Sequence, residues 1–173
     1  MFNKNRKFLL ISIIFVVLSI ALNAFIIYQA CLKGASSSSW SDGVTKTAAD
    51  MINTIKPNTI TEANLPNFSS FIRKAIGHYG LFAVDGIITS LAVYFSICES
   101  KFYKHYWGII ISGGIGLFVA ILTEAIQTFV PGRSGEFLDV LIDASGYLFG
   151  LGIICLILFL ILRHRKKASI NKA

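Results

Sequence analysis

The sequence predicts an all-α, polytopic membrane protein with four transmembrane helices, both termini in the cytoplasm and one segment outside the membrane. Hydrophobic residues make up 54% of the 173 residues, and charged residues only 14%. A composition this apolar is typical of membrane proteins. The apolar residues are concentrated in four blocks, each close to the roughly 20 residues that a helical span requires. We therefore expect one compact membrane domain.

The four predicted spans are helices, because a segment in lipid must satisfy its backbone hydrogen bonds internally. Their expected boundaries are residues 8–31, 75–98, 107–130 and 138–162. Lys and Arg favour the cytoplasmic side of a membrane, so the basic residues before the first span and after the last place both termini in the cytoplasm. Arg73 and Lys74 run against this rule, because they precede the second span on the side that is expected to be extracytoplasmic. The residues that set the orientation are Lys4, Arg6, Lys7, Arg163, Arg165, Lys166 and Lys167.

The net charge of +7 at pH 7 reflects these flanking basic residues and favours contact with anionic lipid. Nucleic-acid binding is not expected, because the basic residues form no separate domain. The first apolar run is too long for the hydrophobic region of a signal peptide, so we interpret it as an uncleaved anchor. The chain then divides into a cytoplasmic N-terminus with the first span (1–31), an extracytoplasmic segment (32–74), a three-helix core (75–162) and a basic cytoplasmic tail (163–173).

The extracytoplasmic segment is predicted to contain one amphipathic helix. It opens with SSSSWSDG, which has the composition of a flexible linker. Ser41 or Asp42 is then a candidate N-cap, and Pro57 is expected to end the helix. Apolar residues at helical spacing favour a helix that lies on the outer membrane surface, and a solvated connector is the alternative. These apolar residues are Val44, Ala48, Met51, Ile52 and Ile55.

The third and fourth spans each carry a stripe that is small in its inner half and polar in its outer half. A short turn, PGRSG, joins the two spans, so they are expected to be antiparallel neighbours. Small residues allow helix backbones to approach closely, and charged side chains facing lipid are costly. We therefore expect the two stripes to face each other. They comprise Gly113, Gly116, Ala120, Glu124 and Gln127 in the third span and Asp139, Asp143, Gly146 and Gly150 in the fourth.

The second span adds His78 and, two turns further in on the same face, Asp85. Arg133 in the turn is the expected counter-ion, because its planar guanidinium can bind a carboxylate or a phosphate through two hydrogen bonds. We therefore predict one outward-facing binding site formed by His78, Asp85, Glu124, Gln127, Arg133, Asp139 and Asp143.

Each of these residues also has a purely structural interpretation. Arg133 could form a salt bridge with Glu124 or Asp139 that closes the hairpin, and His78 could be an interfacial histidine. Asp139 could cap the fourth helix, where the helix dipole favours a carboxylate. The glycines of the fourth span are expected to serve packing. We favour a functional role for the residues that share the outer half of the bundle, where charge is costly, namely Glu124, Gln127, Arg133 and Asp143.

Several of these residues form a pattern that resembles the VanZ-like family. The pattern runs Glu124-x-x-Gln127, Pro131-Gly132-Arg133 and Asp139-x-x-x-Asp143-x-x-Gly146-x-x-x-Gly150. Phe71-Ile72-Arg73-Lys74 and Gly77-His78-Tyr79 resemble the family's entry into its first core helix, so the likeness covers roughly residues 70–160. Asp143 stands where many members are expected to have Asn, which changes the polarity of the site.

The resemblance implies a bacterial plasma-membrane protein that acts near the outer leaflet. The family is named for a protein associated with resistance to teicoplanin, a glycopeptide antibiotic with a lipid tail. The resemblance implies no reaction and therefore no catalytic residue.

Three functions remain open at this point. The favoured one is binding of a lipid-linked headgroup, or a contribution to resistance to lipid-tailed glycopeptides, with Arg133 contacting an anionic group. The second is an enzyme that modifies an envelope lipid, in which carboxylates and His78 do acid–base chemistry or hold a metal ion. The third is a small transporter or accessory subunit in which Asp85 relays protons.

Binding is favoured over catalysis because the chain has no HExxH motif and no nucleophile elbow. No cofactor is expected, since neither GxGxxG nor a P-loop is present, and a metal site stays an open question. The expected partners are membrane lipids or a lipid-linked envelope precursor, with a lipid-tailed glycopeptide and a further copy of this chain as additional candidates.

Overall fold

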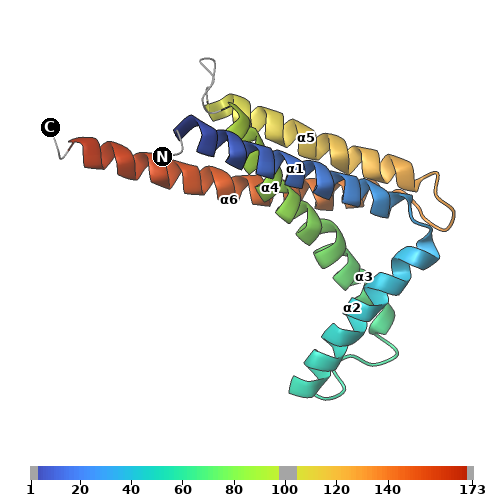
Figure 1. Ribbon diagram of the computed structural model, residues 1–173. Coiled ribbons are helices and arrows are strands. Elements are labelled where there is room, and N and C mark those ends of the chain that lie inside the picture. Colours follow the sequence, from blue (N-terminus) through green and yellow to red (C-terminus); the bar gives the residue numbers. More distant parts are fainter. Residues whose placement is uncertain (1–3, 98–104, 171–173) are drawn as a thin grey trace.

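The computed structural model describes residues 4–97 and 105–170, and within these ranges it contains helices and no strand. Residue 98, the predicted end of the second span, and residues 171–173 of the predicted basic tail lie outside these ranges. The helices are α1 (Lys4–Cys31), α2 (Gly34–Ile55), α3 (Leu65–Ile72), the π-helix η1 (Arg73–Gly80), α4 (Leu81–Ile97), α5 (His105–Gln127) and α6 (Phe137–Ile170) (Figure 1).

The prediction of four spans is confirmed. The helices long and apolar enough to cross a membrane are Arg6–Cys31, Leu65–Ile97, Tyr106–Gln127 and Phe137–His164. The second is longer than predicted, because α3, η1 and α4 follow one another without a break. At about 1.5 Å per residue such a helix exceeds the ~30 Å of a hydrocarbon core. Its α3 end therefore either tilts strongly or extends beyond the core.

The bundle consists of α1, α4, α5 and α6, and its topology fits an even number of spans. The first turn of α1 and the last turn of α6 lie at the same end of the bundle, and the hairpin of α2 and α3 lies at the other end (Figure 1). We call these the terminal end and the hairpin end. The assignment of the terminal end to the cytoplasm stays a prediction from the basic residues.

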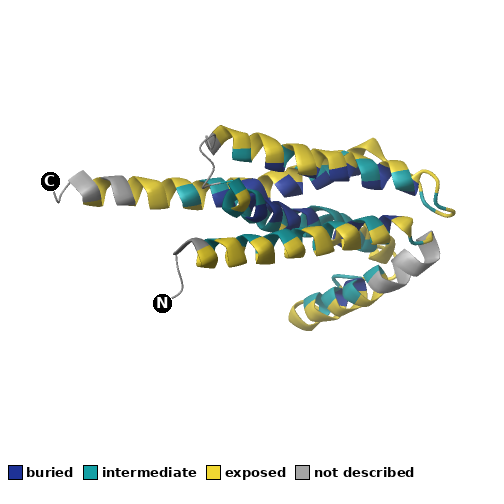
Figure 2. Ribbon diagram, turned by 45° about the horizontal axis from the view of Figure 1, so that its top comes forward, coloured by how far each residue is buried: buried dark blue, intermediate teal, exposed yellow. Residues whose placement is uncertain are grey.

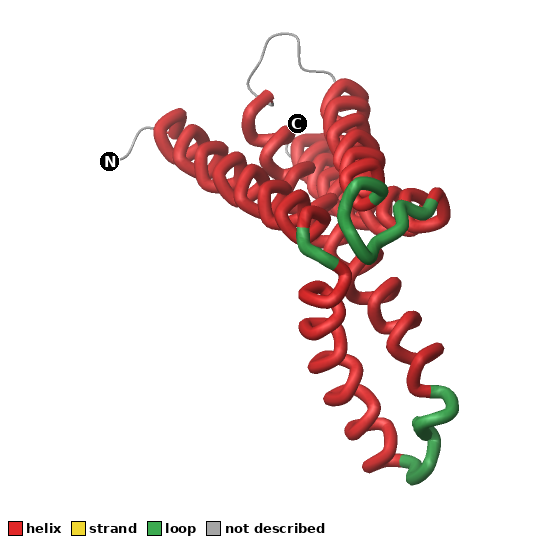
Figure 3. The backbone as a smooth tube through the Cα atoms, turned by 90° about the vertical axis from the view of Figure 1, so that its right-hand side faces the viewer, coloured by secondary structure: helices red, strands yellow, loops and turns green. Residues whose placement is uncertain are grey.

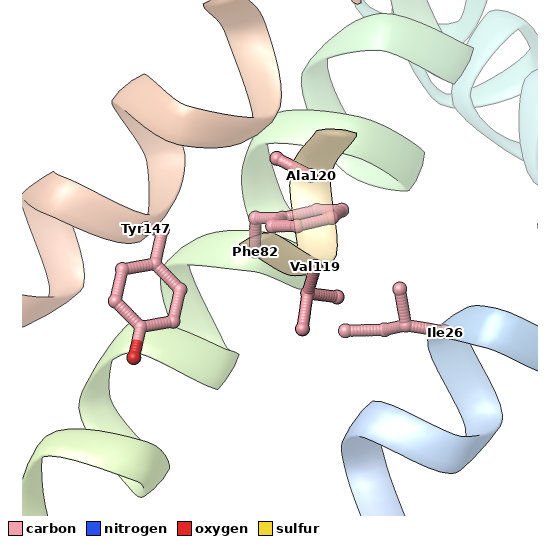
Figure 4. Packing of buried hydrophobic residues seen from close by; sticks show 5 residues of the cluster. All are labelled: Ile26, Phe82, Val119, Ala120 and Tyr147. Atoms are coloured by element: carbon pink, nitrogen blue, oxygen red, sulfur yellow. The ribbon is translucent and has the colours of Figure 1, made fainter. Parts of the chain in front are cut away.

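The core is formed where the four helices of the bundle meet. Its buried cluster comprises one residue from α1, one from α4, two from α5 and one from α6, and Figure 4 shows their side chains. Large hydrophobic side chains cover the outward faces of α1, α5 and α6, where a bilayer would solvate them (Figure 2). The cluster residues are Ile26, Phe82, Val119, Ala120 and Tyr147.

The small residues of α6 pack against a different helix from the one predicted. A Cβ atom on Gly150 would overlap the backbone oxygen of Ala83 in α4, and one on Gly146 would overlap that of Tyr79 in η1. The expected contact with α5 is instead filled by the ring of Tyr147, which lies where a Cβ of Gly116 would be. The predicted packing of α5 beside α6 is thus confirmed, whereas Gly146 and Gly150 of the α6 stripe meet η1 and α4, since periodicity does not identify the partner of each residue on a face.

The segment between α1 and η1 is more helical than predicted. The serines of SSSSWSDG belong to α2, which begins at Gly34, so the flexible linker and the N-cap at Ser41 or Asp42 were wrong. The end of the helix at Ile55, just before Pro57, agrees with the prediction. Figure 3 shows α2 and α3 side by side as a hairpin that projects away from the bundle. A position of α2 on the membrane surface stays a prediction.

Candidate functional site

Polar side chains gather at the hairpin end of the bundle, where η1, the end of α5 and the start of α6 meet. We call this group the polar site. Glu124, Gln127, Asp139 and Asp143 are all buried there, each no more than 6% exposed. The polar site comprises Lys74 and His78 from η1, Glu124 and Gln127 from α5, Arg133 and Glu136 from the turn, and Asp139 and Asp143 from α6.

His78 links η1 to α6 through two carboxylates. Its Nδ1 atom lies 3.0 Å from an Oδ1 of Asp143, and its Nε2 atom lies 3.9 Å from Oδ2 of Asp139. Asp143 is 1% exposed, so protein atoms surround almost all of its surface. His78 lies in the π-helix η1. A π-helix is rare in proteins, and those that occur are often found at functional sites. His78 is therefore part of a polar network with buried carboxylates. The alternative interpretation, an interfacial histidine, does not account for these contacts.

Lys74 is a member of the polar site that the sequence argument missed. Its Nζ atom lies 2.8 Å from Asp139 and 3.3 Å from Glu136. The sequence predicts no binding role for Lys74, which appears there as a basic residue that runs against the orientation rule and as part of the run that resembles the family. Its spacing of four residues from His78 would have placed both side chains on one helix face.

Glu124 fixes the turn between α5 and α6. Its Oε1 atom accepts a hydrogen bond from Nε2 of Gln127 at 3.0 Å, and its Oε2 atom accepts one from the backbone N–H of Glu136 at 3.0 Å. The turn needs glycine at two points. Gly132 has a positive φ of 77°, and a Cβ on Gly135 would overlap the backbone oxygen of Glu124. Both acceptor atoms of this buried carboxylate are thus used within the hairpin.

Arg133 does not form the predicted ion pair with a carboxylate. Its Nη1 atom donates to the backbone carbonyl of Gln29 in α1 at 3.1 Å, and no described carboxylate lies within 4.0 Å of its guanidinium. Burial lowers the pKa of Arg133 from its ordinary value, while Glu124 raises it, Arg73 lowers it and Asp139 raises it at longer range. An arginine stays charged despite such shifts. The structure therefore does not support a salt bridge that closes the hairpin.

Two adjoining cavities meet at the polar site. The larger has a volume of about 540 Å³ and lies between α1, the start of α2, η1 and α4, with mainly apolar lining. The smaller has a volume of about 390 Å³ and lies between α2, α3, η1, the turn and the start of α6, with mainly polar lining. The residues that line both cavities are Ser41, Arg73, His78, Gln127 and Arg133.

Asp85 lies outside the polar site, although the sequence argument placed it there. One oxygen of its carboxylate accepts hydrogen bonds from Asn23 of α1 and from Thr89, both at 2.9 Å. Thr89 is in turn 2.7 Å from the hydroxyl of Ser19. Asp85 lines neither cavity, so it belongs to a second buried network that joins α1 to α4. The spacing of Ser19 and Asn23, two polar residues on one face of an apolar helix, could have indicated this network.

Three members of the polar site are arranged so that they could hold a metal ion. The ligand atoms of His78, Glu124 and Asp143 lie within 4.8 Å of one another. Imidazole nitrogen and carboxylate oxygen suit several divalent metals. The two oxygens of Glu124 are already used as acceptors, so metal binding would compete with the hydrogen bonds of the turn.

Comparison with known proteins identifies a family. A family model described as VanZ/LLP1 matches residues 15–160 of the chain. The match extends beyond the resemblance over residues 70–160 and takes in most of α1 and the whole segment that contains α2 and α3. The expected extent of the likeness, roughly residues 70–160, was therefore too short. No significant match was found among curated proteins or among solved structures.

Proposed function

The chain belongs to the VanZ/LLP1 family, and we propose that it is a protein of the bacterial plasma membrane that binds anionic lipid-linked headgroups at the polar site. Its four membrane-spanning helices make it a multi-pass membrane protein. The polar site lies at the end of the bundle opposite both termini, which is the outer side if the termini are cytoplasmic.

The observation that supports an anionic ligand is the way in which charges are paired. Lys74 lies 2.8 Å from Asp139 and 3.3 Å from Glu136, and His78 lies 3.0 Å from Asp143. Arg73 and Arg133 lie within 4.0 Å of no described carboxylate, and both line the two cavities. Two guanidinium groups that repel each other at the border of a cavity favour an anion between them, and a phosphate can accept hydrogen bonds from both.

The uncharged and acidic members of the site would orient the ligand. Gln127 lines both cavities and Asp143 lines the larger one, so their polar atoms can contact hydroxyl or amide groups of a headgroup. Glu124 would act indirectly, since its carboxylate holds Gln127 and the turn that carries Arg133. Its role is therefore to position the residues that touch the ligand.

We propose a contribution to resistance to lipid-tailed glycopeptides such as teicoplanin as the biological consequence of this binding. The test is antibiotic susceptibility in a sensitive Gram-positive host, with matched amounts of protein in the membrane. The wild type is expected to protect against teicoplanin but not against vancomycin, which has no lipid tail. Arg133→Ala and Glu124→Gln should abolish protection, whereas Arg163→Ala, at the exposed terminal end, should retain it. Equal protection against both drugs would contradict this role.

A metal-dependent enzyme that acts on an envelope lipid is the second candidate. The single observation that favours it is the arrangement of His78, Glu124 and Asp143. The test is the metal content of the purified protein, measured by mass spectrometry after dialysis against trace divalent metals. Stoichiometric metal that is lost in Asp143→Ala and retained in Asp50→Ala, an exposed aspartate of α2, would support the enzyme. Metal content that is negligible in the wild type would exclude it.

A further inference from the structure

The larger cavity has a property that binding of a headgroup alone does not explain. Its walls are formed by apolar side chains from five elements, among them Phe25 and Ile26 of α1, Ile76 of η1, and Leu81 and Phe82 of α4. An anion placed between the two arginines would fill only the border of this cavity. A mainly apolar cavity offers water few hydrogen-bond partners, and a hydrocarbon chain that fills it would gain apolar contacts with these walls.

The two cavities are joined at their charged border. Arg73 and Arg133 line the polar cavity and also the apolar one. A ligand whose charged group lies between them can therefore extend directly into the apolar cavity. The volume of about 540 Å³ falls in the range of cavities that bury small ligands.

We propose that the ligand is an anionic amphiphile whose charged group lies between Arg73 and Arg133 while its hydrocarbon chain occupies the larger cavity. This inference rests on the proposed function, because the charged group is the same one. It adds that part of the hydrocarbon chain of a single lipid molecule is enclosed between α1, η1 and α4. A water-soluble phosphate would satisfy the arginines but leave the larger cavity unfilled.

The position of the chain can be tested by photo-crosslinking. The full-length protein is placed in nanodiscs of phosphatidylcholine that contain a little phosphatidic acid with a diazirine group in one acyl chain. After irradiation, crosslinked peptides are mapped by mass spectrometry. We expect crosslinks concentrated in residues 25–32 and 72–82, which line the larger cavity. Crosslinks spread over the exposed outer faces of α5 and α6, with none in these two segments, would overturn the inference.

Two variants should block the cavity without removing a charge. A Cβ on Gly77 would meet only the side chain of Arg73, at 3.9 Å, so Gly77→Leu should be tolerated and project into the cavity. Ile76→Trp, at a half-exposed lining residue, should fill part of the same volume. Each is expected to lower crosslinking by about tenfold, equivalent to ~1.4 kcal/mol of binding free energy, because its side chain takes space that the hydrocarbon chain would occupy.

The matched controls introduce leucine and tryptophan at positions that do not line the larger cavity. Gly152→Leu puts a leucine on α6 where nothing lies within 4 Å of a Cβ, and Ile110→Trp puts a tryptophan on the exposed face of α5. Both should crosslink like the wild type. If the two cavity variants also crosslink like the wild type, the chain does not occupy the cavity.

Further variants distinguish a failure of this inference from a failure of the proposed function. Arg73→Ala and Arg133→Ala should lower both crosslinking and the binding of inorganic phosphate, measured by calorimetry; unchanged values would contradict the proposed function itself. If crosslinking falls in the arginine variants but not in Gly77→Leu or Ile76→Trp, only the placement of the hydrocarbon chain in the larger cavity is contradicted. Inorganic phosphate in excess should compete poorly with unlabelled phosphatidic acid. If both compete equally well, the hydrocarbon chain adds nothing to the affinity.

Discussion

The guanidinium of Arg133 donates a hydrogen bond to the backbone carbonyl of Gln29, a residue 104 positions earlier in the chain, at 3.1 Å. This bond ties the turn between α5 and α6 to the end of α1. It also holds the guanidinium of Arg133 at the border of the two cavities and more than 4.0 Å from every described carboxylate, whereas Lys74 contacts Asp139 and His78 contacts Asp143. A cation held in this way is available to an anionic ligand.

Gly150→Ala should destabilise the bundle. Its Cβ would overlap the backbone oxygen of Ala83, so α4 and α6 would have to separate. We expect a loss of about 1–3 kcal/mol in the free energy of unfolding, measured in detergent by thermal or denaturant unfolding. Gly152→Ala is the matched control on the same helix, because nothing lies within 4 Å of a Cβ there. Similar stability in the two variants would show that the close approach of α4 and α6 is wrong.

His78→Ala should cost more stability than Asp143→Asn. Removing the imidazole leaves the carboxylate of Asp143, which is 1% exposed, without its partner at 3.0 Å. An unsatisfied buried polar group costs about 1–3 kcal/mol, and more if it is charged. An asparagine at position 143 keeps an oxygen that can accept from a protonated Nδ1. The measurement is the unfolding midpoint of both variants, and a larger loss in Asp143→Asn would contradict the assigned pairing.

Sequence reasoning was most successful where the chemistry is local. The spacing of Glu124 and Gln127 predicted that they share a face of one helix, and their side chains are hydrogen-bonded at 3.0 Å. Asp139 and Asp143 were placed on one face of the next helix in the same way, and both contact His78. The short turn brought these two faces together. Periodicity and connectivity were therefore sufficient to assemble most of the polar site.

Contacts between elements distant in the sequence could not be predicted in this way. Asp85 was assigned to the polar site because it shares a face with His78, but Asn23 of α1 holds it in a separate network. The bond between Arg133 and the carbonyl of Gln29 likewise depends on where α1 lies beside α5 and α6. A sequence pattern shows which face of a helix is buried, and only the packing of the bundle shows what that face meets.

Glu124→Gln should loosen the turn while leaving the bundle folded. An amide has one acceptor oxygen, so it cannot accept from both the Gln127 side chain and the Glu136 N–H as the carboxylate does. We expect faster hydrogen exchange of the Glu136 amide, by about tenfold for a loss of ~1.4 kcal/mol. Exchange elsewhere in α5 and α6 should not change. Glu62→Gln, in the exposed loop before α3, is the control, and an equal effect there would contradict the role of Glu124.

The orientation of the bundle can be tested with single cysteines in a background that lacks the native ones. A cysteine at Asp50, exposed on α2, should react with a membrane-impermeant maleimide in intact cells. A cysteine at Arg163, exposed near the end of α6, should react only after the membrane is opened. This result follows from the excess of basic residues at the terminal end. The opposite pattern would place the polar site on the cytoplasmic side.

We propose that the two arginines at the cavity border, Arg73 and Arg133, bind an anionic headgroup. Native mass spectrometry of the purified protein, titrated with phosphatidic acid and with phosphatidylcholine, measures this most directly. We predict a preference for phosphatidic acid, and a loss of about tenfold or more in its affinity for Arg133→Ala, as expected when a hydrogen bond to a charged group is removed. Arg133→Lys should recover only part of that affinity, because lysine lacks the planar fork. Arg163→Ala should bind like the wild type. Equal affinity for both lipids, or an Arg133→Ala variant that binds phosphatidic acid as tightly as the wild type, would contradict the account.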